Sequence, residues 1–257
     1  GKSPMEFREC LYFLVNPWDV SLLSWVGIVV LKEVLLQCLA CSINMIFVGH
    51  ETLPTRKVAK SVPQRSLETI DHVYLGLNSC IEAVFSAHLL YYCWHAADVR
   101  RSPGDLGLLN GPMALYLLIV FNDMLYAPLH RCLHHPFLYK WVHKHHHRVA
   151  FPQRGNVDAR NEHPIEQIMG LLCLWAAMHL VVASVGMHVA VPPLSLMGML
   201  VFSCMNHSPW DINFTVLGID FSVGAHEMHH RKLDANFGQL VMFWDRLMGT
   251  YVPYAAK

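Results

Sequence analysis

The chain has 257 residues, of which 54% are hydrophobic and only 15% charged, and its mean hydropathy is +0.31. Nineteen Lys and Arg balance nineteen Asp and Glu, so the formal net charge is zero. Such a composition is unusual for a soluble globular domain, and a neutral chain has no general field that attracts nucleic acid. We therefore expect one integral membrane domain over residues 1–257, with the lipid bilayer and not nucleic acid as its partner.

The N-terminal part, residues 20–98, predicts two membrane-spanning helices. Residues 21–48 and 69–95 are both strongly apolar and long enough to cross a bilayer, which needs about 20 residues. Lys32 and Glu33 interrupt the first stretch, so a buried or interfacial helix is the alternative for either one. The N-terminus shows no signal-peptide pattern, and membrane insertion is expected to come from these internal segments.

The remainder, residues 106–253, predicts the metal-binding core. A third span runs from about Leu106 to Pro128. Between Glu166 and Asp211 there is no charged residue at all, which suits two helices joined by a tight turn at Val191-Pro192-Pro193. The expected fold is thus all-α, an integral membrane bundle of four to five spans.

The basic residues predict the orientation of this bundle. With five spans, residues 49–68, 130–163 and 207–257 lie on one side and carry fourteen Lys and Arg, against four on the other side. Positive charge is enriched on the cytosolic side of membrane proteins. We therefore expect the histidine-rich cap to face the cytosol, with the endoplasmic reticulum as the membrane. Eight cysteines without a CxxC pair fit a reducing compartment.

Histidine is the unusual residue of this chain, with eighteen copies. Three clusters have members three or four residues apart, a spacing that places imidazoles on one face of a helix. Two single histidines flank the apolar hairpin and return to the same side. The candidate metal ligands are His130, His134, His143, His146, His147, His163, His207, His226, His229 and His230. An isolated pair is usually a surface feature, but the combination predicts a metal centre.

Ten imidazoles are too many for one ion, so two ions are expected. Neutral imidazole suits iron, zinc, copper and nickel alike. Four carboxylates are candidates to hydrogen-bond the far nitrogen of a ligating ring, although each is equally explicable as a helix-end charge. They are Asp123, Glu162, Asp211 and Asp245. Four aromatic residues are candidates to line the substrate route, although aromatics are common at any membrane interface. They are Trp141, Phe151, Trp210 and Phe243.

Several segments within residues 106–253 resemble the fatty acid hydroxylase/sterol desaturase superfamily of membrane di-iron enzymes. They are His130 to His147, His163-Pro164-Ile165-Glu166, His207, His226-Glu227-Met228-His229-His230, and Asn236-Phe237-Gly238-Gln239 with the segment from Phe243 to Thr250. The resemblance implies two iron ions, O2 as oxidant, and electrons from NAD(P)H through cytochrome b5 or a similar separate carrier. It also implies hydroxylation or desaturation of a sterol or fatty-acyl lipid.

The resemblance does not select one reaction. The run from His130 to His147 is similar to sterol C5-desaturases, whereas His163-Pro164-Ile165-Glu166 is similar to sterol C4-methyl oxidases. Residues 154–162 match neither pattern.

Two other classes of function remain as alternatives. The first is a metal-binding membrane protein without redox chemistry, such as a zinc transporter, although transporters place ligands within spans and these clusters lie beyond span ends. The second is an inactive member of the same fold with a structural or regulatory role.

Overall fold

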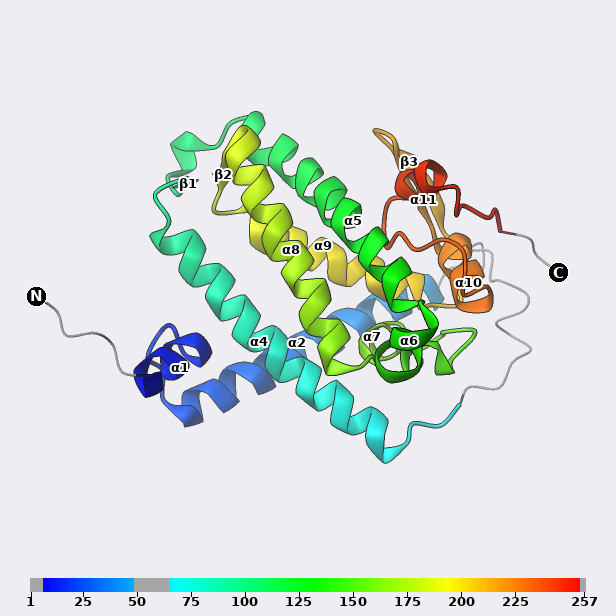
Figure 1. Ribbon diagram of the computed structural model, residues 1–257. Coiled ribbons are helices and arrows are strands. Elements are labelled where there is room, and N and C mark those ends of the chain that lie inside the picture. The colour runs from blue at the N-terminus through cyan, green and yellow to red at the C-terminus, as the bar shows by residue number, and fades with distance from the viewer. Residues whose placement is uncertain (1–6, 49–64, 255–257) are drawn as a thin grey trace, which may run out of the picture.

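The computed structural model describes residues 7–48 and 65–254, which form a helical bundle with a small cap at one end (Figure 1). The helices are α1 Phe7–Val15, α2 Leu22–Val48, α4 Thr69–His95, α5 Ala114–Leu133, α6 Pro136–Leu138, α7 Asn156–Arg160, α8 Pro164–Val185, α9 Val191–Asn206, α10 Val223–Arg231 and α11 Phe243–Met248. Single turns occur at Pro103–Asp105, Leu109–Met113, Tyr139–His143 and His146–Arg148. Short strands are β1 Val99–Arg100, β2 Met187–His188, β3 Asn213–Val216 and β4 Ile219–Ser222.

Four helices in the described part of the chain are long and apolar enough to cross a membrane. They cover Leu22–Ile43, Thr69–His95, Leu109–Leu133 and Pro164–Val185. The predicted all-α membrane bundle is therefore confirmed, and the first two spans lie where the sequence placed them. The third begins and ends a few residues later than expected because a π-helical turn at Leu109–Met113 leads directly into α5.

The uncharged stretch forms two helices as predicted, but their connection lies before the two prolines. The second helix, α9, is not among the helices long enough to cross a membrane, and it packs mainly on α5 and α7 and not on α8. Gly186, with φ of 73°, ends α8, and Ala190 precedes the first residue of α9. Pro192 instead lies in the first turn of α9, where its missing N–H is not needed for the helix. Helix α9 has 16 residues and thus a length of about 24 Å, shorter than the other four.

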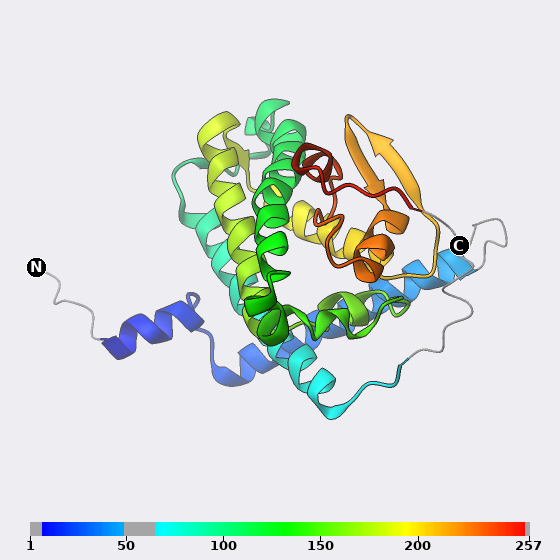
Figure 2. The same ribbon diagram turned by 45° about the vertical axis from the view of Figure 1, so that its right-hand side comes forward.

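The core of the bundle lies between α4, α5 and α8, which run side by side in both views (Figure 2). Ala114 and Ala177 are fully buried where α5 meets α8, and small residues allow two helix backbones to approach closely. Leu89 of α4 and Leu118 of α5 fill the space around them. Helix α2 packs across α4, and α1 lies beside the far end of α4.

The cap is built by the chain after α9. Strands β3 and β4 form an antiparallel hairpin whose Phe221 packs with Val223, Leu240 and Val241. The buried carboxylate of Asp123, on α5, accepts hydrogen bonds from the backbone N–H groups of Leu240 and Val241. Because Asp123 belongs to a span, this contact attaches the cap rigidly to the bundle.

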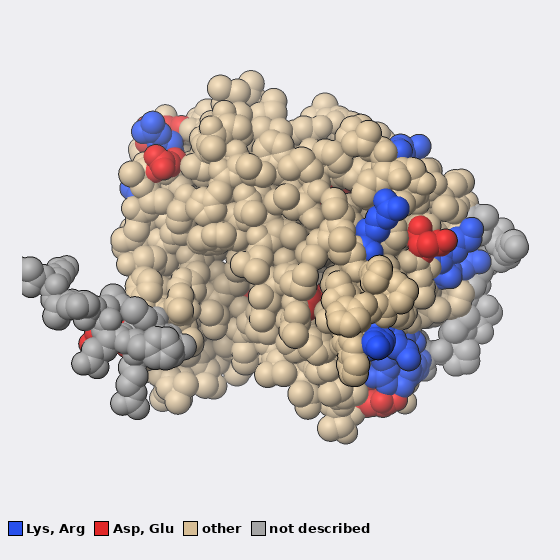
Figure 3. Space-filling model, viewed as in Figure 1, with Lys and Arg blue, Asp and Glu red and all other residues tan. Residues whose placement is uncertain are grey.

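Charged side chains are sparse on the face made by α4, α5 and α8, and Lys and Arg gather at the cap end (Figure 3). This distribution suits a belt of lipid around the bundle. The cytosolic orientation stays a prediction, and the basic residues between positions 49 and 64 that support it lie outside the described residues. The seven cysteines that the structure describes are free thiols.

Candidate metal centre

Nine of the ten candidate histidines converge in two groups where the bundle meets the cap. Within each group, every histidine has a ring nitrogen within 4.8 Å of a ring nitrogen of each other member. The five-histidine group consists of His130, His134, His143, His147 and His229, and the four-histidine group of His146, His207, His226 and His230. Members of both groups come from distant parts of the chain. Each group therefore exists only when the cap is folded onto the bundle.

The two HxxHH motifs connect the groups to each other. In the first motif, His143 and His147 belong to the five-histidine group, whereas His146 belongs to the four-histidine group. In the second motif, His226 and His230 share one group and His229 lies in the other. In both motifs the first and last histidines thus belong to one group and the middle histidine belongs to the other. Each motif therefore fixes the spacing between the two groups.

Local backbone structure produces this arrangement in two ways. Helix α10 begins at Ser222, whose Oγ accepts a hydrogen bond from the N–H of Ala225, so the second motif lies on a regular helix. The first motif is not α-helical. It passes through a π-helical turn at Tyr139–His143 and a 3-10 turn at His146–Arg148. Pro136, directly after His135, begins a new helix and ends the run that carries His130 and His134.

The Nε2 atoms within each group are close neighbours. In the five-histidine group, Nε2 of His143 lies 2.9 Å from Nε2 of His130 and 2.9 Å from Nε2 of His147. In the four-histidine group, Nε2 of His226 lies 3.1 Å from that of His207 and 3.2 Å from that of His230. Metal–nitrogen bonds of about 2.1 Å place adjacent ligands roughly 3 Å apart, so both groups have the spacing of a ligand shell.

Several rings are oriented by a hydrogen bond from the opposite nitrogen, Nδ1. That of His130 donates to the carbonyl of Phe237 at 2.8 Å, and that of His229 donates to the carbonyl of Ala235 at 2.8 Å. His143 donates to a carboxylate oxygen of Glu166 at 2.6 Å. A carbonyl can only accept, so the proton must lie on Nδ1 and the Nε2 lone pair is left for a metal.

This geometry fits a cation site. The Nε2 lone pairs of His130 and His143 face each other at 2.9 Å, and two lone pairs at that distance repel unless a cation lies between them. Burial lowers the pKa of His134 to about 3 and, with neighbouring imidazoles, holds those of His147 and His229 well below the ordinary value. Neutral imidazole is the form that binds metal. The nine side chains therefore fit two metal ions.

A search for relatives identifies the lineage of this centre. The family model described as "Fatty acid hydroxylase" matches residues 115–250, from α5 through α11. The chain belongs to the fatty acid hydroxylase family. This confirms the superfamily to which the histidine and C-terminal motifs were similar.

Curated relatives match about half of the chain. The chain is 31% identical to methylsterol monooxygenase 1 of Rattus norvegicus over 140 residues, which cover 53% of this chain and 46% of the relative. It is 30% identical to a Delta(7)-sterol 5(6)-desaturase of Leptosphaeria maculans over 137 residues, covering 52% and 35%. It is 29% identical to fatty acid hydroxylase ahd1 of Mycosarcoma maydis over 120 residues, covering 47% and 29%. The chain thus covers less than half of each relative. No solved structure matches.

The tenth predicted ligand of this family member, His163, lies apart from both histidine groups. Its ring caps the start of α8, where Nδ1 accepts a hydrogen bond from the N–H of Ile165 at 3.2 Å, and it packs against the ring of Tyr74. Pro164 places His163 at the N-cap, and this position directs the ring toward its own helix. We therefore leave His163 out of the proposed ligand set.

None of the four predicted carboxylates contacts a ligating histidine ring. Asp123 and Asp245 bind backbone N–H groups instead. Asp245 accepts from Phe237 and Gly238 at 2.7 Å each, and so fixes the loop whose carbonyl orients His130. Asp211 accepts from the amide of Asn213 in the β3 region. Asp123 and Asp245 therefore act on the histidines only indirectly, through the backbone that they bind. The structure shows no contact between Asp211 and a ligating histidine.

Glu166 is the carboxylate that the sequence analysis missed in this role. It is buried in the first turn of α8 and contacts His143, which lies 23 positions earlier in the chain. Glu162 interacts with Glu166, and burial raises the pKa of Glu162 to about 8. The carboxyl pair of Glu162 and Glu166 therefore lies directly behind the ring of His143. The signal available beforehand was an acidic residue at the very start of an apolar span.

A cavity of about 460 Å³ connects the histidines to the interior of the bundle. At one end it is lined by His146, His207 and His226 of the four-histidine group and by His130 of the five-histidine group. Its apolar wall consists of Leu35, Leu36 and Leu39 of α2 and Leu196, Met197 and Leu200 of α9. Pockets of this size and character hold small apolar ligands.

The four aromatic residues predicted to line the substrate route do not line this cavity. Trp141 is 69% exposed and Phe243 49% exposed, both on the outside of the molecule. Phe151 stacks with Arg231 in the cap, and Trp210 lines a separate small pocket beside Met205. The role of these four residues along a substrate route stays a prediction, and the structure does not bring them to this cavity.

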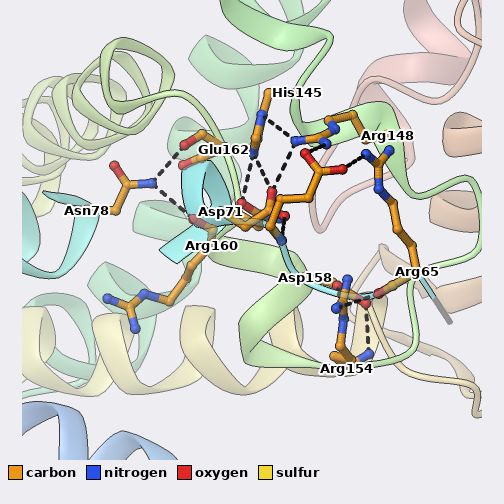
Figure 4. A network of polar contacts seen from close by, with 11 residues as sticks. Arg65, Asp71, Asn78, His145, Arg148, Arg154, Asp158, Arg160 and Glu162 are labelled. Carbon is orange, nitrogen blue, oxygen red and sulfur yellow. Dashed lines mark hydrogen bonds and ion pairs between the residues drawn. The ribbon is translucent and has the colours of Figure 1, made fainter. Parts of the chain in front are cut away.

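A polar network holds the first HxxHH motif against α4 (Figure 4). Asp71 of α4 contacts His145 at 2.9 Å and Arg148 at 3.2 Å, and it accepts a hydrogen bond from Asn161 at 3.0 Å. His145, the histidine of this run that lies outside both groups, therefore points toward α4. This leaves its neighbours His143, His146 and His147 to face the centre.

Proposed function

We propose that this protein catalyses the O2-dependent oxidation of a C–H bond in a membrane lipid, at two iron ions held by the nine converging histidines. The observation that carries this proposal is the junction between a nitrogen-only metal centre and a largely apolar cavity inside a membrane bundle. A sterol or a fatty-acyl lipid is the proposed substrate, because the relatives are named for a methylsterol, a sterol and a fatty acid.

An unactivated C–H bond offers neither an acidic proton nor a leaving group, and bound iron supplies the redox chemistry that such a bond requires. The residues of the chain contribute position and exclusion of water. Glu166 and the backbone carbonyls keep the histidine rings in one tautomer and orientation. The leucines of α2 and α9 hold the lipid in a water-poor cavity.

The electrons are proposed to come from NAD(P)H through a separate carrier such as cytochrome b5. The proposed location is the endoplasmic reticulum, with the cap in the cytosol. Hydroxylation and desaturation both remain within the proposal, since they share the metal centre and differ in how the substrate lies.

Untargeted lipid mass spectrometry tests the proposal. Cells that produce the chain are compared with cells that produce His146→Ala. A new lipid heavier by one oxygen indicates hydroxylation, and one lighter by two hydrogens indicates desaturation. Iron analysis and O2 uptake of the purified chain accompany the comparison. Bound metal without O2 uptake, together with identical lipid profiles, would support a non-redox or regulatory role instead.

A further inference from the structure

The cavity beside the histidines has a polar wall in addition to its leucines and methionines. Lys32 of α2, Glu82 of α4, and Arg160 with Asn156 of α7 all line it. Residues 154–162, which include α7, are also the stretch that matched neither sterol-oxidising pattern. This stretch therefore faces the place where a lipid would lie.

The charges on this wall are already paired. Lys32 lies 2.9 Å from Glu82 and 3.2 Å from Glu33. Arg160 contacts the same two carboxylates, each at 2.9 Å, and donates to the Oγ of Ser79 at 2.7 Å. Two cations and two anions sum to zero, and Glu162 and Glu166, which also line the cavity, add no positive charge. The cavity therefore has no excess positive charge to attract a phosphate or a carboxylate.

Asn156 is different from these residues. It is 2% exposed, and neither its amide nitrogen nor its amide oxygen has a hydrogen-bond partner within the described parts of the chain. Buried amides are nearly always hydrogen-bonded, so one without a partner requires an explanation. Asn78, an equally buried amide nearby, donates at 3.0 Å to the carbonyls of both Arg160 and Glu162.

The position of Asn156 is fixed from both ends of α7. On one side, the N–H of Gly155 donates to the carbonyl of His207 at 2.9 Å. On the other side, Asn78 holds residues 160 and 162 as described. Asn156 therefore lies at a constant place beside the four-histidine group, and it lines the same cavity as His146, His207 and His226.

We propose that the Asn156 amide hydrogen-bonds a hydroxyl group of the lipid and thereby sets which carbon faces the histidines. A hydroxyl both donates and accepts, which matches the two free functions of the amide, and it is uncharged, which matches the balanced wall. This assignment rests on the proposed function only in taking a lipid as the occupant of the cavity.

Binding to matched probes tests this assignment without turnover. The full chain, purified with its metals, is incubated with cholestanol and cholestane, and separately with 1-hexadecanol and hexadecane. Each pair differs by one hydroxyl. We expect wild type to bind one of the alcohols about tenfold more tightly than its hydrocarbon, and Asn156→Ala to bind both members of that pair equally. Asn213→Ala, an exposed asparagine in β3, is the matched control and keeps the wild-type ratio.

Three results would overturn the assignment. The first is a wild-type chain that prefers neither alcohol. The second is an Asn156→Ala chain that keeps the preference. The third is an Asn156→Ala chain whose metal content falls, since the amide would then act on the metal centre. Asn156→Ser, with a smaller polar side chain, is expected to keep part of the preference and replaces the alanine variant if that does not fold. A wild-type chain that prefers an alcohol but oxidises no lipid would overturn the proposed function alone.

Discussion

The two histidine groups are built from the same motifs but face different surroundings. Only His130 of the five-histidine group lines the cavity, whereas three of the four members of the other group do. The five-histidine group in turn is the one that contacts a carboxyl group, because Glu166 hydrogen-bonds to His143. An ion in the five-histidine group would therefore be surrounded by protein and supported through His143 by Glu166, whereas an ion in the four-histidine group would face the cavity. We infer that the four-histidine group is the side on which the lipid reacts.

Removing one histidine ring from either group has the largest expected effect and tests whether each group holds its own ion. His229→Ala and His146→Ala should each lower lipid oxidation roughly 10³-fold or more, because each removes a ligand of one ion. Metal analysis should show a loss of about one ion per chain in either variant. Full activity in either one would contradict the assignment of its group.

Glu166→Gln should separate the groups. The amide keeps the shape of the side chain but removes the carboxyl group behind His143, so we expect metal affinity to fall about 10- to 100-fold for one ion only. Metal titration of the purified chain, read as two classes of site, measures this. Equal weakening of both classes would show that the two groups do not act separately.

Acid should destabilise the metal-free chain. The pKa of His134 is about 3 in the folded protein against an ordinary value of 6.5. The folded state therefore binds fewer protons than the unfolded state between these values, and the contribution of His134 is fully present above pH 6.5 and declines as the pH falls toward 3. Each such histidine contributes about 1.4 kcal/mol per pH unit in this window.

Thermal melts of metal-free protein at about pH 7.5, 6.5 and 5.5 should show this decline. Bound metal should delay it, because ligation competes with protonation. A melting temperature that rises as the pH falls would contradict the buried, neutral state of these rings.

Asp220→Asn should have the smallest effect. Asp220 lies in β4 and pairs with Arg246 at 2.7 Å on the surface of the cap. Exposed pairs of this kind contribute less than about 1 kcal/mol. Metal content and oxidation should both stay at the wild-type level, and this variant serves as the matched carboxylate-to-amide control for Glu166→Gln. A loss of metal would mean that the hairpin supports the centre.

The sequence alone was enough to predict features that repeat along the chain. The spans follow from continuous apolar runs, and the convergence of His226, His229 and His230 follows from helical spacing. The sequence also predicted that separate clusters meet on one side, and the structure brings nine of the ten histidines together. Their binding of metal stays a prediction.

Features that depend on tertiary contacts were not predictable in the same way. Glu166 meets His143 only because α8 begins beside the π-helical turn, and no spacing rule connects positions 23 residues apart in that geometry. Asp123 and Asp245 were expected at histidine rings, but they accept hydrogen bonds from loop N–H groups instead, because a buried N–H without an acceptor is costly. The β3–β4 hairpin was not expected, because four-residue strands have too weak a pattern.

The short length of α9 has a consequence for the histidine that follows it. At 16 residues, or about 24 Å, α9 is shorter than a hydrocarbon layer of about 30 Å, and it is not among the four helices long enough to cross a membrane. It packs on α5 and α7, and His207 follows its last residue. A longer helix on the same path would carry His207 past the other three rings of its group, so the length of α9 is matched to the position of the four-histidine group.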